Sequence, residues 1–163
     1  MPSIALVDPS QNEFLASLES KTKQPNPFFR AMAHRPEVLK SFVPFYSAVM
    51  GPGAVERRIK MLLYLACSYA NRCAFCIAAN TPGALKAGAT EQELQALKDE
   101  WDDVFAESER AAIRYARELT RTGDAMASRA ALAGHFADEQ IAEMTLVICF
   151  ANFTNRFNNG LQI

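Results

Sequence analysis

The sequence predicts an all-α protein built as a single domain. Apolar residues recur at helical spacing along most of the chain, and no stretch alternates as a strand would. Glycine and proline separate the periodic stretches at intervals typical of short and medium helices. At 163 residues, half of them hydrophobic, the chain has the size of one domain and enough apolar side chains for a core.

Residues 1–50 are expected to form a helical cover over a core made by residues 51–163. Pro44 is expected to kink or end the third helix of this cover, because proline lacks an N–H and its ring clashes with the preceding turn. Gly51-Pro52-Gly53 then breaks the chain before the core begins. The cover is predicted to contain an extended arm over residues 1–9 and helices over 11–23, 28–34 and from 36 onward.

The core is expected to contain the longer helices. Thr90 and Glu93 form a capping-box pattern, which predicts that a helix begins at residue 91. Gly88 and Gly123 are expected to end helices. The final helix is apolar on nearly every side, which is typical of a helix at the centre of a fold or in a subunit interface. The expected core helices cover residues 54–70, the cysteine pair to 87, 91–98, 108–122, 128–136 and 139–157.

The composition argues against several classes of protein. The net charge is −1, and the basic residues are scattered and matched by acids, so no nucleic-acid partner is expected. No run reaches the roughly 18 apolar residues of a membrane span, and the first residues do not resemble a signal peptide. The cytoplasm is therefore the expected location. There, four cysteines are expected to be reduced, catalytic or metal-binding instead of forming a structural disulfide framework.

Cys73 and Cys76 are the candidate catalytic residues. Two cysteines three apart place their sulfurs one helical turn apart, close enough to form a disulfide or to share a metal. The unpaired amides at a helix N-terminus stabilise a thiolate over a thiol. The pattern predicts a redox dithiol in which Cys73 is the more exposed thiolate and Cys76 its partner, with the order of attack left open.

Two plainer interpretations of the pair stay open. The cysteines can be small apolar residues packed in a core, or they can hold a metal, for which zinc would need two further ligands. The remaining cysteines and histidines show no ligand spacing with the pair, so no metal or cofactor is predicted. Cys67 and Cys149 are interpreted as core residues, and His34 and His135 as structural residues at helix ends.

Other polar and aromatic residues receive structural interpretations. The charged segment from Glu56 to Lys60 is expected to be a solvated helix start. Tyr69 and Trp101 are expected to be buried. Asn155-Arg156 is interpreted as a buried polar pair that fixes the last helix, because buried polar groups must find partners.

An ordered set of motifs runs from the first long helix to the C-terminus. That helix is followed by Cys73-Ala74-Phe75-Cys76 and then by the segment Lys86–Leu94, and the chain ends with Glu143–Leu146 and Asn155-Arg156-Phe157. This order, over about residues 51–163, resembles the carboxymuconolactone decarboxylase / alkylhydroperoxidase D superfamily. The resemblance implies an all-helical fold and a homo-oligomer, a trimer or a hexamer of trimers.

For the cysteine-bearing branch, the resemblance implies thiol peroxidase or disulfide-reductase chemistry. The substrate would be a small-molecule peroxide or disulfide, and a lipoyl protein or another thiol protein would restore the dithiol.

Two positions depart from that branch. It places a His four residues after the second cysteine, where this chain has Asn80, which can form hydrogen bonds but cannot titrate at physiological pH. It also places a Glu twelve residues before the first cysteine, where this chain has Met61, interpreted as core packing. Glu56 points about 140° away from Met61 on a helix and does not replace that base. Asn80 is retained as a candidate supporting residue.

The sequence thus supports an oxidoreductase of the alkylhydroperoxidase or disulfide-reductase type, slowed by the missing Glu/His relay. A general base typically contributes about 10²–10⁴-fold to a rate, so its loss slows the reaction without forbidding it. The alternative is a non-catalytic or ligand-binding scaffold with the same fold. A carboxymuconolactone-decarboxylase-type enzyme is less favoured, because that branch generally lacks the cysteine pair and nothing here supplies a base in the expected place.

Overall fold

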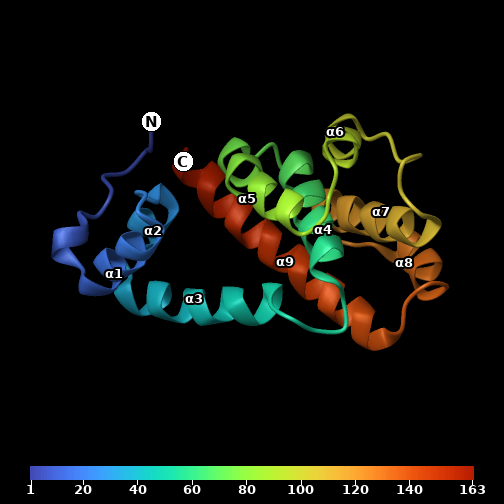
Figure 1. The fold of residues 1–163 in the computed structure, drawn as a ribbon, viewed down its shortest axis with the longest axis horizontal. Coiled ribbons are helices and arrows are strands. Elements are labelled where there is room, and N and C mark those ends of the chain that lie inside the picture. Colours follow the sequence, from blue (N-terminus) through green and yellow to red (C-terminus); the bar gives the residue numbers. More distant parts are fainter.

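The structure, a computed structural model, describes all 163 residues and is entirely helical, as predicted (Figure 1). The N-terminal helices lie at one end of the molecule, and α6, α7 and α8 lie at the other. After a short 3-10 turn, η1 (Pro9–Gln11), the helices are α1 (Glu13–Thr22), α2 (Pro27–Met32), α3 (Pro36–Met50), α4 (Arg57–Ala70), α5 (Ala74–Lys86), α6 (Glu91–Asp99), α7 (Glu107–Thr122), α8 (Met126–Ala133) and α9 (Asp138–Leu161).

Helix α4 is the element around which the others pack. Every side chain from Lys60 to Ser68 is buried, and α4 contacts α5, α6, α7 and α9. Helix α9 runs diagonally across the molecule in Figure 1 and also contacts α3, α5, α7 and α8. The buried hydrophobic side chains form one continuous cluster. Of the two places expected for the last helix, the centre of the fold or a subunit interface, the structure shows the first. No helix combines the length and the apolar character needed to cross a membrane.

Local sequence signals set most helix ends. The Thr90–Glu93 capping box is present, with both reciprocal hydrogen bonds formed. Gly123 ends α7 in the left-handed conformation, at φ 76°. Of the two effects expected of Pro44, a kink or an end of the helix, the second does not occur, because α3 continues through it to Met50. Pro44 lies on an exposed side of α3, where water can bond the carbonyl that loses its N–H partner.

The start of α4 is a buried ionic cluster, and the expectation of a solvated helix start was wrong for two of its residues. Lys60 is fully buried. Its Nζ donates to the carbonyls of Val49 at 3.1 Å and Gly51 at 2.6 Å and forms an ion pair with Glu143. Arg58 forms ion pairs with Glu93 and with Glu109.

Glu143 also explains a glycine in the connection between α3 and α4. Its carboxylate accepts a hydrogen bond from the Val55 N–H at 2.8 Å. A Cβ at Gly53 would lie 1.9 Å from Glu143 Oε1. Because Lys60 and Val55 hold that carboxylate in place, only glycine fits at position 53 without moving it.

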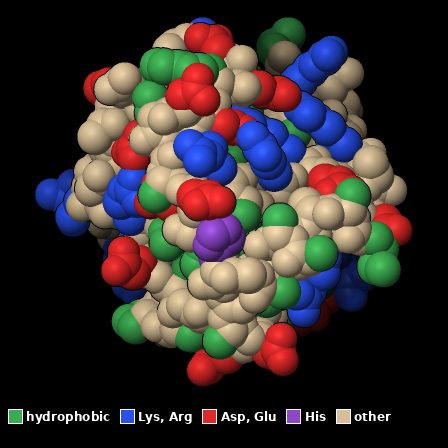
Figure 2. Space-filling view, turned by 90° about the vertical axis from the view of Figure 1, so that its right-hand side faces the viewer, with side chains coloured by type: hydrophobic (Ala, Val, Ile, Leu, Met, Phe, Trp, Pro, Cys, Tyr) green, Lys and Arg blue, Asp and Glu red, His purple; other side chains and the backbone are tan.

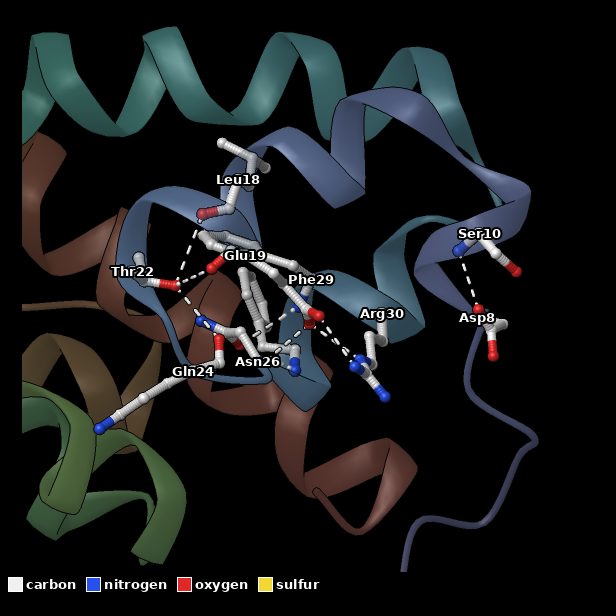
Figure 3. A network of polar contacts seen from close by, with 10 residues as sticks. Asp8, Ser10, Leu18, Glu19, Thr22, Gln24, Asn26, Phe29 and Arg30 are labelled. Atoms are coloured by element: carbon white, nitrogen blue, oxygen red, sulfur yellow. Dashed lines mark hydrogen bonds and ion pairs between the residues drawn. The ribbon is translucent and has the colours of Figure 1, made fainter.

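A second polar network holds α2 against α1 (Figure 3). Arg30 donates to both carboxylate oxygens of Glu19, at 2.8 Å each, and Glu19 also accepts the Asn26 N–H at 2.9 Å. Asn26 in turn caps α2, because its Oδ1 accepts from the N–H groups of Phe28 and Phe29. The hydrogen bonds from Arg30 hold the pKa of Glu19 below its ordinary value of 4.5, against the opposite effect of burial.

One face of α9 carries exposed apolar side chains. Leu146, Cys149 and Phe153 are spaced three and four residues apart, which places them on one side of the helix. Leu146 and Phe153 are each about half exposed, and Phe45 of the adjoining α3 is 52 % exposed. The interpretation of Cys149 as a core residue was therefore wrong, whereas Cys67 is buried as predicted.

The end of the molecule formed by α6, α7 and α8 is polar and mixed in charge (Figure 2). Arginines of α7 pair with acids from the loop after α6, as in Arg117–Asp102 and Arg121–Glu100. His135 lines a shallow groove here, between α7 and α8. Trp101 lies in the same loop and is 45 % exposed, so its predicted burial was wrong.

Replacing Lys60 with Met is expected to lower the free energy of unfolding by about 3 kcal/mol. The change leaves the Glu143 carboxylate without its countercharge in a largely buried place. In a Lys60→Met/Glu143→Gln double variant, part of this loss should return, because the neutral amide still accepts from the Val55 N–H. Urea unfolding measures both effects, with the exposed Lys40→Met as the control. A loss no larger than that of the control would contradict the assignment.

Replacing Glu19 with Gln is expected to destabilise the protein in a pH-dependent way. The pKa of Glu19 is lower in the folded than in the unfolded chain, so its stabilising effect is complete above about pH 4.5 and is lost as the pH falls through the folded value. The difference in unfolding free energy between wild type and variant should therefore be largest near neutral pH and shrink below 4.5. The exposed Glu56→Gln, which removes no ion pair, is the control. A difference that stays constant from pH 7 to 3 would argue against the network.

Candidate functional site

The cysteine pair lies at the start of α5, as the sequence predicts. Cys73 is the N-cap residue, and its Sγ accepts a hydrogen bond from the Cys76 N–H at 3.3 Å. The two cysteines form a disulfide, with Cα atoms 5.3 Å apart. The pair is thus placed to alternate between a dithiol and a disulfide without a large backbone movement.

A tight turn before Cys73 sets the angle between α4 and α5. Arg72 adopts the left-handed conformation with φ 54°, which is uncommon for a residue other than glycine. Helix α9 fixes this turn from the side: the Asn159 side chain donates to the Asn71 carbonyl, and the Asn71 side chain donates to Asn152 and Asn155.

The Asn155-Arg156 pair proves to be buried only in part. Asn155 is fully buried and donates to Ser68 Oγ at 3.2 Å. Arg156 is exposed, and its guanidinium bonds Asn152 and the carbonyl of Thr120.

Cys76, and not Cys73, faces a pocket. Both cysteines are buried, at 1 % and 0 % exposure, but only Cys76 lines the cavity of about 180 Å³ beside α5. The expectation that Cys73 is the more exposed sulfur was therefore wrong. As the N-cap, Cys73 is turned toward the backbone of the first helical turn. A molecule that enters the pocket meets Cys76 first.

The pocket is apolar and carries no charged side chain. Its walls come from the cover helices α2 and α3 on one side and from α4, α5 and α9 on the other, so the N-terminal cover helps to build the site. Seven of its lining residues are Phe or Tyr. The lining residues are Asn26, Phe28, Phe29, Phe42, Val43, Tyr46, Tyr64, Phe75, Cys76, Ala79, Asn80, Phe150, Thr154 and Asn158.

Asn158 is the polar residue closest to the chemistry. Its Nδ2 donates to Cys76 Sγ at 3.2 Å. Its Oδ1 is buried and has no hydrogen-bond partner in the protein. Sequence reasoning missed this residue, because asparagine does not titrate and Asn158 lies 82 positions from Cys76. The only available signal was the unusual density of asparagines at the end of the last helix, Asn152, Asn155, Asn158 and Asn159.

Tyr64 and Thr154 form the second polar contact of the pocket. Their oxygens lie 2.6 Å apart. Thr154 Oγ1 also lies 2.9 Å from the Ala151 carbonyl, to which it donates, so the Tyr64 hydroxyl supplies the hydrogen between the two side chains. Burial raises the pKa of Tyr64 to about 12. Tyr64 is therefore a neutral phenol at physiological pH and does not act as a base.

The two positions that lack the family's relay residues have different surroundings. Asn80 lines the pocket, and its Nδ2 donates to the Cys76 carbonyl at 2.8 Å. Met61 is 1 % exposed and packs against Gly83 of α5, as its interpretation as core packing predicts. Neither histidine replaces the missing base: His34 bonds the Ala5 carbonyl, and His135 lies at the other end of the molecule. No group of three or more His, Cys, Asp or Glu side chains is placed to hold a metal ion.

Comparison with known proteins places this geometry in a family. The model of the carboxymuconolactone decarboxylase family matches residues 36–118. The Bacillus subtilis protein YdfG is 30 % identical over 112 residues, which cover 64 % of this chain and 74 % of YdfG.

Solved structures share the fold. A peroxidase-related protein from Ralstonia eutropha JMP134, described as an alkylhydroperoxidase AhpD core, superposes with a TM-score of 0.83 at 18 % identity over 99 % of this chain and 90 % of that one. A variant of the debrominase Bmp8 in complex with 2,3,4-tribromopyrrole superposes with a TM-score of 0.81 at 17 % identity over 99 % and 92 %. Because the family model matches just over half of its length, the chain belongs to the carboxymuconolactone decarboxylase family.

Proposed function

We propose that Cys73 and Cys76 form a dithiol that reduces a small organic peroxide. The family and the peroxidase-related structural relatives support a peroxidase-like antioxidant role in general terms. The observation that carries the specific proposal is the position of Cys76, whose sulfur meets an apolar pocket on one side and is disulfide-bonded to the N-cap cysteine on the other. A nucleophile at a pocket and a resolving thiol beside it are the two groups that a dithiol peroxidase needs.

The reaction proceeds in two steps. The Cys76 thiolate attacks the terminal oxygen of the peroxide, the O–O bond breaks, and the alkoxide takes a proton to leave as an alcohol. Cys76 is thereby oxidised to a sulfenic acid. The Cys73 thiol then attacks the Cys76 sulfur, water leaves, and the disulfide seen in the structure forms.

The pocket supplies hydrogen bonds where the family's active branch has a base. The Asn158 Nδ2 donates to the Cys76 sulfur, and the Cys76 N–H, in the first turn of α5, donates to the Cys73 sulfur. These donors favour the thiolate. They cannot accept its proton, so the rate should rise with pH until the Cys76 thiol is ionised.

Regeneration requires a reductant that reaches a buried disulfide. We propose a dithiol delivered through the pocket, either as a small thiol or as the lipoyl arm of a partner protein, in a reducing compartment such as the cytoplasm. The incoming thiolate attacks Cys76, Cys73 leaves as a thiol, and the second thiol of the reductant completes the exchange.

A ligand-binding scaffold is the alternative. The absence of every titratable base from the pocket favours it, and so does its aromatic lining. The debrominase Bmp8, which shares the fold, holds a bromopyrrole. In this case the disulfide would form without turning over.

The two cysteines should give different products in single-turnover reactions with cumene hydroperoxide. Cys73→Ser should accumulate a Cys76 sulfenic acid that dimedone traps, about one adduct per chain by mass spectrometry. Cys76→Ser should give none at the pair, because Cys73 does not line the pocket. Cys149→Ser is introduced into all proteins so that the exposed thiol does not contribute.

Steady-state turnover with dithiothreitol or dihydrolipoamide separates the enzyme from the scaffold. The Cys149→Ser protein should turn over peroxide, and either pair variant should lose at least about 100-fold. Equal rates in all three proteins, or a dimedone adduct on Cys73 in Cys76→Ser, would contradict the proposed roles.

We also propose that the protein is a homo-oligomer, a trimer or a hexamer, that buries the apolar face of α9. Leu146, Phe153 and the adjoining Phe45 are each about half exposed in the isolated chain. An exposed apolar face of this kind is typical of a subunit interface.

Leu146→Asp should convert the oligomer to a monomer, because a buried carboxylate without a partner is costly in an interface. Size-exclusion chromatography with light scattering measures the mass. Met126→Asp is the matched control, since Met126 is an isolated residue with 76 % exposure on α8. A wild-type chain that is monomeric at all concentrations would exclude this proposal.

A further inference from the structure

The unpaired oxygen of Asn158 requires an explanation. The side chain is 2 % exposed, and Oδ1 is the only buried side-chain N or O atom without a hydrogen-bond partner in the protein. A buried acceptor left unsatisfied is costly, and native structures contain few of them. The opposite end of the same amide is engaged, because Nδ2 donates to Cys76 Sγ. Asn158 is thus held in place with its acceptor unused at the wall of the pocket.

The rest of the pocket selects what can meet this oxygen. Five phenylalanines line it: Phe28, Phe29, Phe42, Phe75 and Phe150. The rings of Phe28 and Phe42 meet edge to face, and those of Phe42 and Phe150 stack. No charged side chain is present, so an ionic ligand would lose its hydration without compensation. An engineered apolar cavity of about 150 Å³ is known to hold benzene, so a volume of about 180 Å³ fits one ring with a small substituent.

We infer that the pocket binds a small, neutral aromatic molecule that carries one O–H or N–H group, and that this group donates to Asn158 Oδ1. The ring packs among the phenylalanines, where edge-to-face and offset contacts are favourable. The donor gives a partner to Oδ1, the one fully buried side-chain acceptor that has none in the protein. Because Oδ1 is covered in this structure, a small shift of the pocket-lining side chains accompanies binding. This places the polar end of the ligand beside the Cys76 sulfur.

The role of this ligand as a substrate rests on the proposed peroxidase function. A peroxide substrate of this class would be an aromatic hydroperoxide, whose terminal O–H is both the donor and the site that Cys76 attacks. Asn158 then touches both reactants, the sulfur through Nδ2 and the peroxide through Oδ1. Binding itself needs no turnover, so it can be measured on the oxidised protein, in which the disulfide is intact.

Phenol and toluene are suitable probes, because they have nearly the same shape and differ in the O–H group. Their dissociation constants are measured by titration calorimetry or ligand-observed NMR for the oxidised wild type and for Asn158→Leu, a near-isosteric variant without the acceptor. The preference for phenol over toluene should fall by at least about tenfold in the variant, the size expected when a buried donor loses its acceptor. Asn158→Asp, which keeps an acceptor oxygen, should retain most of the preference.

Two outcomes would overturn the inference. One is that neither probe binds the wild type. The other is that the ratio of the phenol and toluene dissociation constants is the same in wild type and Asn158→Leu, as it would be if a tightly held water occupied Oδ1. If Asn158→Leu does not fold, Asn158→Ala replaces it, because it also removes the acceptor, and an unchanged phenol-to-toluene ratio in that variant would overturn the inference in the same way. Binding with the expected ratio but without peroxide turnover would support the ligand class and reject the peroxidase.

Discussion

The register of α4 on α9 is the constraint on which the rest of the structure depends. Three polar contacts advance in the same direction along both helices: Lys60 with Glu143, Tyr64 with Thr154, and Ser68 with Asn155. Because α4 is buried from Lys60 to Ser68, its polar side chains must pair with protein groups. Lys60 finds all its partners outside α4, whereas the Ser68 hydroxyl also donates to the Tyr64 carbonyl of its own helix. A shift of one residue along either helix would break all three contacts. The same register carries α9 one turn further, and that turn brings Asn158 to the sulfur of Cys76.

The sequence predicts those features of the fold that depend on neighbouring residues. Caps and breaks such as Thr90 and Gly123 act within one turn, so they locate helix ends from sequence alone. The N-cap position of Cys73 is predictable for the same reason. The misplaced residues depend on distant elements. Lys60 is buried because Glu143 and two carbonyls surround it, and Cys149 is exposed because nothing in the chain packs on that side of α9.

The site likewise contains residues that local sequence reveals and residues that only the fold brings together. Cys73 and Cys76 are recognisable by their spacing, but the pocket is assembled from the cover helices, from α5 and from the end of α9. Its aromatic residues are indistinguishable in sequence from those of an ordinary core, because burial of phenylalanine is the general rule. The assignment of the pocket-facing sulfur also needed the structure, since both cysteines lie in the first turn and only their directions differ.

The missing relay becomes intelligible once the pocket is seen to be uncharged. A charged His at position 80 would need hydration or a partner, and the aromatic walls offer neither. A single amide can still couple the two reactants. When Oδ1 of an asparagine accepts a hydrogen bond, its N–H groups become stronger donors, because hydrogen bonds in series polarise one another. A ligand that donates to Asn158 Oδ1 therefore strengthens the bond from Nδ2 to the Cys76 sulfur and favours the thiolate when the substrate is present. In such a site the substrate helps to activate its own nucleophile, a role that a base would otherwise fill.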